Sequence, residues 1–352
     1  MALFPPQLRD WQIPSEAPLT PHALRRVCRE AAVQPFERAA ESLNEDWQTH
    51  LEAKQIQRWV EPVGLRLARE RDAEVRRSEA GRPPAGPVQA PEILAISPDG
   101  GRIQMREKNT ETGSRWRETK VAAITSYKPG RGELKPEPQT TTYVATLAGC
   151  QEFKKIARVE AERRGLQRAL QVLALGDGGN WIDPLVAEEF PEAERILDWY
   201  HACEHLHACA RAVHGSETPA AKRLGDWLET QLWKGRVEKV IARLKTLSKQ
   251  LGAPRSADPL EHPRRVVGTN VGYFEKNAAH MDYPRYRNNG WPIGSGNVEA
   301  GVKQFNKRVK GTDQFWQPSG AEAMLNLRAC LISQDLRWSR YWSNRPAYFF
   351  AA

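Results

Sequence analysis

The chain has 352 residues, which is enough for two or three domains with cores of their own. Its net charge of +9 favours a polyanionic partner, and no stretch approaches the roughly 18 consecutive apolar residues of a membrane helix, so no membrane partner is expected. Five scattered cysteines argue against a disulfide framework, and the N-terminus shows no secretory signal, so a reducing, cytoplasmic setting is expected.

Residues 1–80 are predicted to be a helical N-terminal region. Apolar residues recur near helical spacing in PHALRRVCREAAVQPFERAAESL and in KQIQRWVEPVGLRLARERDAEVRR, where Pro62 is expected to break the helix. The stretch GRPPAGPVQAP, residues 81–91, is rich in proline and glycine and is predicted to be a linker.

The pattern then changes to strands. ILAIS (93–97) and GRIQMRE (101–107) flank PDGG, which predicts a hairpin turn, and KVAAITSY (120–127) is a third strand candidate. TTYVATL is a further short strand candidate. QEFKKIARVEAERRG (151–165) has the spacing of a helix, and ALQVLAL (169–175) that of a buried strand that ends at GDGGNW.

From 183 to about 250 the pattern is helical throughout, and residues 252–292 are irregular, with several prolines and glycines. GSGNVEAGVKQFNKRVKG (294–311) is typical of a loop that leads into a helix, and GAEAMLNLRACLIS (320–333) is another helix. No internal repeat is visible.

Three acidic residues stand out by their positions. Asp99 follows the strand ILAIS, Asp177 follows QVLAL, and Glu299 lies in the first turn of a helix after GSG. If the two strands are neighbours in one sheet, the carboxylates can converge, and converging carboxylates are the ligands that Mg²⁺ prefers. Two such ions can activate an attacking oxygen and stabilise a leaving one, which is the chemistry of phosphodiester cleavage and strand transfer.

A structural explanation exists for each of these residues. Asp in DG and DGG is a common turn former, because its side chain bonds to its own backbone and Gly accepts positive φ. Glu299 is also favoured in a first helical turn by the helix dipole, and with Lys303 and Lys307 it has the i, i+4, i+8 spacing of a surface ion-pair ladder. Spacing alone leaves both interpretations open.

The chain resembles the DDE transposases of bacterial insertion sequences, specifically the ISKra type within the Mutator-like group. The resemblance covers roughly residues 92–345 and rests on stretches that occur in order: SPDGGRIQMRE, WRETKVAAI, LGDGGNWI, ILDWYHACEHL, NGWPIGSGNVEAGVK, RVKG and GAEAMLNLRA. PIGSGNVE and DWYH are the most specific of them. His280 and the stretch GTDQFWQ depart from the expected pattern, as in a divergent or domesticated copy.

The resemblance implies an α/β fold: an RNase H-like catalytic core, which is a mixed sheet flanked by helices, interrupted by an all-helical insertion domain. It places the core in residues 92–182 and 286–352 and the insertion in residues 183–285. It implies that Asp99, Asp177 and Glu299 are catalytic and hold two Mg²⁺ or Mn²⁺ ions. The expected activity is cleavage and strand transfer of transposon-end DNA, by a chain that is a homodimer when paired on two ends.

DWYHACEHLHACARAVH, residues 198–214, contains four histidines and two cysteines and invites comparison with a zinc site. On a helix at about 100° per residue, Trp199, Cys203 and Leu206 fall on an apolar stripe and His201 on another face, so no structural zinc is expected. Asp198 and His201 match the Asp-x-x-His signature of Mutator-like transposases, which implies that they support the catalytic pocket or contact a phosphate. The alternative is an Asp–His contact that only fixes the helix.

DNA contacts are expected just after Glu299. Lys303, Lys307, Arg308 and Lys310 are candidates for phosphate contacts, while Trp316 and the tail RWSRYWSNR are candidates for stacking on unpaired bases. The alternative, that tryptophans fill the core, is preferred for Trp181 and Trp199. Recognition of transposon ends is assigned to the N-terminal helices, which carry these candidate arginines: Arg25, Arg26, Arg66, Arg69 and Arg71.

Two rival functions remain open from the sequence. A domesticated transposase could recognise DNA without cutting it, and an RNase H-like nuclease could act inside a larger nucleic-acid complex. Cleavage followed by strand joining would separate a transposase from a nuclease.

Overall fold

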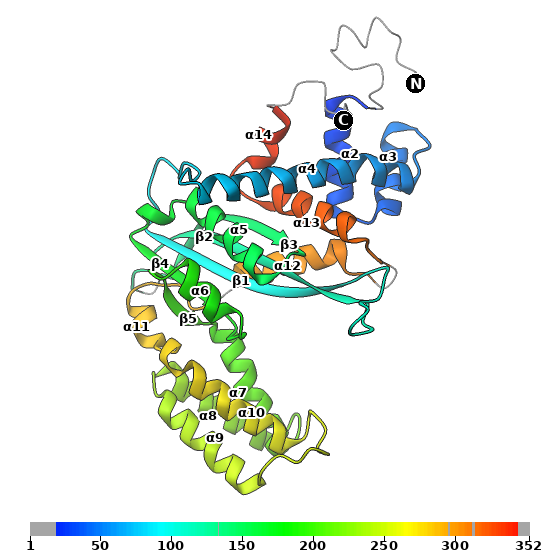
Figure 1. Ribbon diagram of the computed structural model, residues 1–352. Coiled ribbons are helices and arrows are strands. Elements are labelled where there is room, and N and C mark those ends of the chain that lie inside the picture. Colours follow the sequence, from blue (N-terminus) through cyan, green and yellow to red (C-terminus); the bar gives the residue numbers. More distant parts are fainter. Residues whose placement is uncertain (1–18, 133, 295, 312–313, 344–352) are drawn as a thin grey trace, which may run out of the picture.

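The structure is a computed structural model that describes residues 19–343 apart from 133, 295 and 312–313. A mixed five-stranded sheet lies at its centre (Figure 1). The strands are β1 (Ile93–Gln104), β2 (Trp116–Lys128), β3 (Glu137–Thr146), β4 (Gln171–Gly176) and β5 (Glu194–Leu197), in the order β3-β2-β1-β4-β5. β1, β2 and β3 form an antiparallel meander, and β4 and β5 run parallel to β1. This order and these directions are those of an RNase H-like core, so the predicted fold class is confirmed.

Alternation along the strands sorts the core onto two faces of the sheet. Leu94 and Ile96 of β1 pack in one hydrophobic cluster with α5 (Cys150–Arg163) and α6 (Ile182–Glu189). Ala95 and Ile103 face the other side and belong to two further clusters, one beneath α7 (Trp199–His214) and one beneath α12 (Gly296–Val309) and α13 (Pro318–Ile332). Asp99 lies between them on this second face, where the two clusters meet.

β1 continues through the stretch that was predicted to be a hairpin turn. Residues 98–101 pair with residues 119–122 of β2, and neither Gly100 nor Gly101 has a positive φ. The chain reverses instead between Met105 and Arg115. Among the described strands, β4 pairs with β1 only as far as Ile96. At Pro98, β1 is therefore paired with β2 alone, and a strand that is paired on one side tolerates proline.

Three N-terminal helices, α2 (Pro21–Val33), α3 (Phe36–Trp47) and α4 (Ala53–Glu79), share the hydrophobic cluster of α12 and α13. The predicted break at Pro62 is wrong, because α4 runs through this proline and its buried side packs against α13 (Figure 1). Where the two helices cross, a Cβ added to Gly64 would lie 2.3 Å from the backbone oxygen of Ala323. Glycine at this position therefore allows the close contact that holds α4 on the sheet domain.

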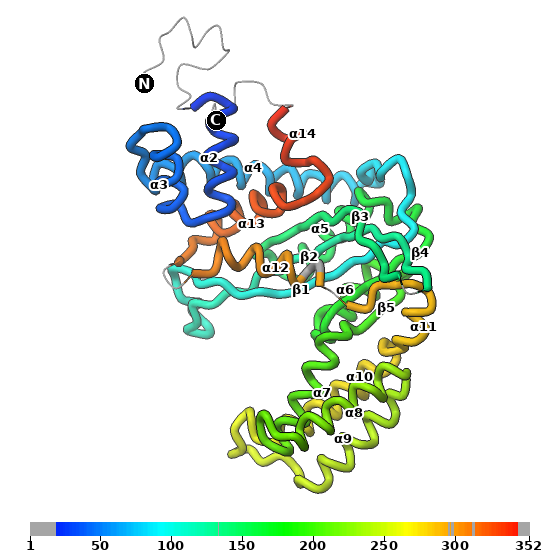
Figure 2. Tube along the Cα trace, turned by 180° about the vertical axis from the view of Figure 1, so that it is seen from behind, coloured from blue at the N-terminus to red at the C-terminus, as the bar shows by residue number. Residues whose placement is uncertain are grey.

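The helical insertion projects from the sheet as a separate lobe (Figures 1 and 2). It consists of α7, α8 (Pro219–Trp233), α9 (Val237–Leu251) and α10 (Pro263–Asn277), and α11 (Tyr283–Asn288) leads back to the sheet. The sequence placed its start near 183, but α6 and β5 still belong to the sheet domain, so the lobe begins at residue 199. The hydrophobic cluster of the lobe includes Leu173 and Ile196 of the sheet, so the lobe packs on the sheet through shared apolar residues.

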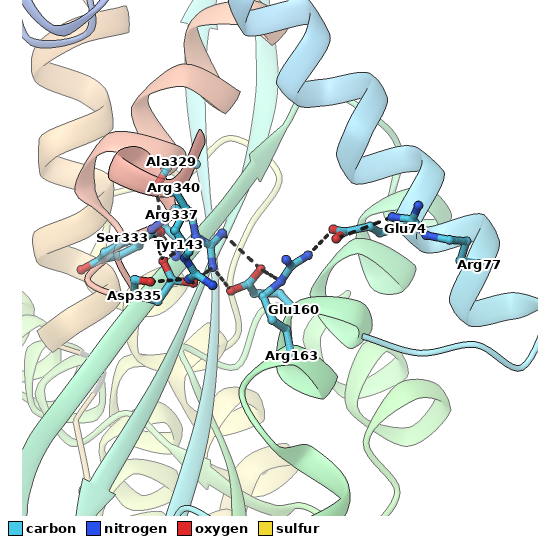
Figure 3. Close-up of polar contacts among 10 residues, drawn as sticks. All are labelled: Glu74, Arg77, Tyr143, Glu160, Arg163, Ala329, Ser333, Asp335, Arg337 and Arg340. Atoms are coloured by element: carbon cyan, nitrogen blue, oxygen red, sulfur yellow. Dashed lines mark hydrogen bonds and ion pairs between the residues drawn. The ribbon is translucent and has the colours of Figure 1, made fainter. Parts of the chain in front are cut away.

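A buried ion-pair network joins α5 to the segment after α13 and to α4 (Figure 3). Glu160 of α5 is 3% exposed and pairs with Arg337 of α14 (Arg337–Ser343) and with Arg163. Arg163 contacts Glu74 of α4, and Asp335 Oδ1 lies 2.8 Å from Arg337 Nε. The network therefore fastens three elements that surround the β3 edge of the sheet.

Candidate active site

Two neighbouring parallel strands carry the two predicted aspartates. Asp99 lies in β1, three residues beyond the last pairing with β4, and Asp177 directly follows Gly176, the last residue of β4. The Oδ1 atom of Asp99 accepts the Gly100 N–H at 2.6 Å. The Oδ1 atom of Asp177 accepts the Gly179 N–H at 3.0 Å. Both carboxylates are therefore positioned at the same end of the β1–β4 pair.

The charge of Asp99 is coupled to three other side chains. Its pKa is raised above the ordinary value, chiefly because burial disfavours the carboxylate; negative charge on Asp177 and Glu299 adds to this rise. The Gly100 N–H and His201 act in the opposite direction. The structure thus brings the three predicted carboxylates into one electrostatic neighbourhood, although they come from three distant segments.

Glu299 reaches this place from the first turn of α12. Its side chain is 34% exposed, and Lys303 Nζ lies 3.9 Å from its Oε2. The helix lies close against the sheet, because a Cβ on Gly301 would be 2.3 Å from the ring of Tyr143. The glycine therefore lets α12 press onto β3, and this contact fixes the direction from which Glu299 arrives.

Asp198 is fully buried and caps α7. Its Oδ1 atom accepts the backbone N–H groups of Tyr200 at 2.7 Å and His201 at 3.0 Å, and its own N–H donates to Gly176 O at 2.9 Å. The first turn of α7 is thus tied to the end of β4, directly beside Asp177.

The loop before α12 lies on the same turn of α7. The N–H of Trp199 donates to Ile293 O at 2.9 Å, and a Cβ on Gly294 would be 2.8 Å from the ring of Tyr200. The start of α7, the end of β4 and the approach to α12 therefore meet at one point, which is where the resemblance placed its most specific stretches.

His201 lies beside the carboxylates with its ring partly exposed. Burial lowers the pKa of His201, but the contact of Nδ1 with Glu204 at 3.2 Å and the charges of Asp198 and Asp177 outweigh it, so that the pKa is raised overall. This imidazole consequently favours its cationic form more than an ordinary histidine does, and it adds positive charge to an acidic site.

The other histidines of α7 have partners of their own. His205 Nδ1 lies 2.6 Å from Asn270 Oδ1, and burial lowers the pKa of His205. His207 Nε2 lies 2.9 Å from Glu229 of α8. Within the described residues, no three His, Cys, Asp or Glu side chains lie close enough together to hold one metal ion, and this applies to the histidine cluster and to the carboxylates alike.

Two residues of α10 support the Asp177 loop and were not singled out in the sequence. A Cβ atom added to Gly178 would lie 3.0 Å from the ring of Tyr273 and 3.1 Å from the Asn277 amide, so both side chains pack against this loop. Burial, followed by the charge of Asp177, raises the pKa of Tyr273. The i, i+4 spacing of the two residues in NVGYFEKN was a signal that they share a face, but the sequence did not indicate what that face contacts.

The structure contradicts two of the predicted DNA contacts. Arg308 is 1% exposed, donates to Ala31 O, and lies over the rings of Phe36 and Trp316; burial lowers its pKa to about 9. Trp316 is 7% exposed, and its Nε1 donates to Val309 O at 2.8 Å. Both side chains anchor α12 on α2 and α3 and are not available to DNA.

The lysines of α12 and the aromatic residues of the tail differ in their exposure to solvent. Lys303, Lys307 and Lys310 are exposed, as a phosphate contact requires. The aromatic residues of α14 are buried in the cluster of the N-terminal helices, so base stacking by them is excluded in this conformation. Residues 344–352 of the tail lie outside the described chain. Trp181 and Trp199 pack in the core, as preferred from the sequence.

The N-terminal arginines are largely engaged within the protein. Arg71 pairs with Glu322 of α13 at 2.8 Å, and Arg26 with Asp46 of α3 at 3.1 Å. Arg66 lies 3.3 Å from Glu70 one turn on. Arg25 is half-buried and Arg69 is exposed. Arg71 is the most buried of the three paired arginines, so a role in helix packing accounts for it.

Comparison with known proteins gives little beyond this geometry. No protein-family model matches the chain, and no curated protein matches it. Among solved structures, a similar one is the Drosophila P element transposase strand transfer complex, with 10% sequence identity, coverage of 92% of this chain and 94% of that chain, and a TM-score of 0.40. At this level of similarity, neither the activity nor the partners of that protein can be transferred to this chain. No helix of the described chain is long and apolar enough to cross a membrane.

Proposed function

We propose that the chain is a DDE-type transposase of the insertion-sequence kind, which binds transposon ends and then cuts and joins DNA strands. The observation that carries this proposal is the position of Asp99 and Asp177 at the same end of two paired parallel strands, with Glu299 of α12 near enough for its charge to raise the pKa of Asp99. Such a concentration of carboxylates disfavours folding and is expected where a cation or a reaction requires it.

The donor set suits a divalent cation. Carboxylate oxygens are the preferred ligands of Mg²⁺ and Mn²⁺, and Asp99, Asp177 and Glu299 would hold two such ions. When bound, the ions would make water or a 3′-hydroxyl a better nucleophile and would neutralise the leaving oxygen. Because no three described side chains already lie within reach of one ion, we expect the carboxylates to draw together on binding.

The remaining groups of the site act on the DNA. His201, whose pKa is raised, would place a proton and positive charge beside a phosphate oxygen. Lys303 and Lys307 are exposed on α12 beyond Glu299 and would position the backbone through charge. Asp198 acts indirectly, because it holds the helix that carries His201.

Strand joining tests this proposal. Labelled duplexes with the DNA borders that flank the coding sequence are incubated with the protein, supercoiled plasmid and Mg²⁺. We expect label to become joined to the plasmid, and Glu299→Gln to abolish nicking and joining while end binding is retained. Glu238→Gln is the matched control, since Glu238 is also an exposed glutamate in the first turn of a helix, here α9.

The outcome separates the rival functions. Nicking without joining would identify a nuclease, and binding without nicking a domesticated DNA-binding protein. Joining by Glu299→Gln at the wild-type rate would exclude the proposed catalytic set. Products joined at both ends in a single event would support the proposed homodimer on paired ends.

A further inference from the structure

The far end of the β1–β2 hairpin exposes two aromatic rings, each beside a cation. Trp116, the first residue of β2, is 44% exposed, and Lys310 Nζ lies 5.7 Å from its ring centroid. Phe315 is 41% exposed, and the Arg115 guanidinium carbon lies 5.8 Å from its ring centroid. These four residues are called the hairpin platform below.

A pocket of about 350 Å³ lies beside the platform, and two platform residues, Trp116 and Arg115, line it. Buried Trp316 and Met105 also line it, and their backbones are joined by a β-bridge. Large exposed aromatic rings beside a pocket are unusual in a surface that serves only solubility. The platform thus combines exposed aromatic rings with cations at the end of two paired strands.

Basic residues outnumber acidic ones around this pocket, whose lining includes Arg106, Lys108, Arg115 and Arg117 but Glu107 as the acidic residue. Arg106 and Arg117 donate at 3.2 Å to the backbone oxygens of Phe315 and Leu147, and Arg115 donates to the backbone oxygen of Arg106. Within the ranges that the structure describes, none of the three arginines forms an ion pair with a carboxylate. Arg71 and Arg337, by contrast, pair with carboxylates in the interior. The hairpin therefore presents positive charge to a partner.

We propose that the hairpin platform binds unpaired DNA bases next to the site of cleavage. Exposed aromatic rings stack on bases of any sequence, and flanking cations hold the phosphates between them. Duplex DNA does not expose its base faces, so this pairing of aromatic rings with cations fits a single strand better than a double helix. The inference rests on the proposed function, which it deepens by naming the form of DNA that is bound.

The strand geometry sets the position of the unpaired bases. Trp116 pairs with Gln104 of β1, and Gln104 is five residues along the same strand from Asp99. At about 3.3 Å per residue this is roughly 17 Å. If the strand keeps the 3.4 Å spacing that its nucleotides have in duplex DNA, about five nucleotides separate the scissile phosphate from the bases on the platform.

The test compares two labelled duplexes of the same sequence by fluorescence anisotropy. One is fully paired, and the other has about five unpaired nucleotides beside the expected cleavage position. We expect the wild-type protein to prefer the unpaired duplex, and Trp116→Ala to bind it roughly ten-fold more weakly, while its affinity for the paired duplex changes less than about two-fold. Trp116→Phe should retain the preference, because a ring remains.

Trp227→Ala is the matched control, because Trp227 on α8 is similarly exposed, at 42%, but lies in the insertion lobe. Equal weakening of both duplexes by Trp116→Ala, in a variant with an unchanged melting temperature, would overturn the inference. If the wild-type protein binds both duplexes equally, the platform does not read unpaired bases, although DNA binding stands. If it binds neither, the proposed function fails as well.

Discussion

Asp99 carries a carboxylate in surroundings that disfavour its charge. Burial and two neighbouring carboxylates raise its folded-state pKa above the value of about 3.9 that it has in an unfolded chain. Ionisation therefore costs the folded state more than the unfolded one. This cost is absent well below pH 3.9, grows as the pH rises toward the folded-state pKa, and is complete above it.

Asp99→Asn should consequently raise the melting temperature at pH 7, because the amide keeps the shape of the side chain and removes the charge. The gain should shrink as the pH is lowered below the folded-state pKa and should vanish well below pH 3.9, where the wild-type carboxyl is protonated in both states. Thermal unfolding across this pH range measures the effect. Asp226→Asn, at an exposed position of α8, is the control and should give no gain. A gain that is constant with pH would mean that the charge is not the cause.

Divalent cations should offset the loss of stability that the Asp99 charge causes. If Mg²⁺ binds among the carboxylates of the folded protein, it stabilises that state by about 2.7 kcal/mol at a concentration one hundred times its Kd. We expect the melting temperature of the wild-type protein to rise with Mg²⁺ or Mn²⁺, and that of Asp99→Asn to rise much less. An equal rise in both proteins would place the bound cation elsewhere.

Neighbouring basic residues of α12 should behave differently toward DNA. Lys307 is exposed, whereas Arg308 is buried against α2 and α3. Lys307→Ala should therefore weaken binding to all DNA sequences and lower the slope of log affinity against log salt by about one unit. Arg308→Met fills the same space without a charge and should leave the slope unchanged. A change of slope in Arg308→Met alone would contradict this assignment, because it would show that Arg308, and not Lys307, meets DNA.

At the scale of elements, the buried network at Glu160 holds α5 against α14. Glu160→Gln would leave Arg337 with Asp335 as its remaining carboxylate among the described residues, and would also remove the carboxylate that Arg163 of the same helix contacts. We expect a loss of about 3 kcal/mol in the free energy of unfolding, measured with denaturant. Glu192→Gln breaks a surface pair with Arg158 and should cost less than about 1 kcal/mol. Similar losses in the two variants would contradict a special role for the network.

The crossing of α4 and α13 depends on the absence of a side chain at Gly64. Gly64→Ala would force a methyl group against the Ala323 backbone and should cost about 3 kcal/mol. Gly272→Ala, within α10, meets nothing within 4 Å and should stabilise the protein by about 0.5–1 kcal/mol through helix propensity. Denaturant unfolding of both variants separates steric conflict from propensity. A neutral Gly64→Ala would show that the helices can move apart freely.

Across the whole molecule, local sequence patterns predicted most of the helices and strands, whereas long-range contacts decided which residues pair and which are buried. The apolar run QVLAL was sufficient to predict β4, and its parallel pairing with β1 puts Asp177 at the same end of the sheet as Asp99. PDGG has the composition of a turn, but pairing with β2 keeps it extended. The burial of Arg308 depends on Ala31, 277 positions away, and on Phe36, and no spacing within α12 could reveal it.

The insertion lobe shows the same division. The helices α7, α8 and α9 were visible in the spacing of apolar residues, but residues 252–292 were predicted to be irregular and contain α10 and α11. The four-residue strand β5, which precedes the lobe, was hidden in a stretch predicted to be helical. The support of the Asp177 loop by Tyr273 also depends on how the lobe folds back on the sheet. The sequence therefore indicated the charged residues of the candidate site, but not Tyr273 and Asn277, which support the Asp177 loop.

If the hairpin platform holds unpaired bases as proposed, the uninterrupted course of β1 sets the distance along DNA between the cleavage site and those bases. Its rise of about 3.3 Å per residue nearly equals the 3.4 Å spacing of successive nucleotides, so protein and DNA have commensurate repeats over the distance from Asp99 to the hairpin end. Two added residues in each of the paired strands would preserve the alternation of faces and lengthen the interval by about two nucleotides. One added residue would turn the hairpin end over. The position at which DNA opens is thereby encoded as a length of backbone, independent of any base that the protein reads.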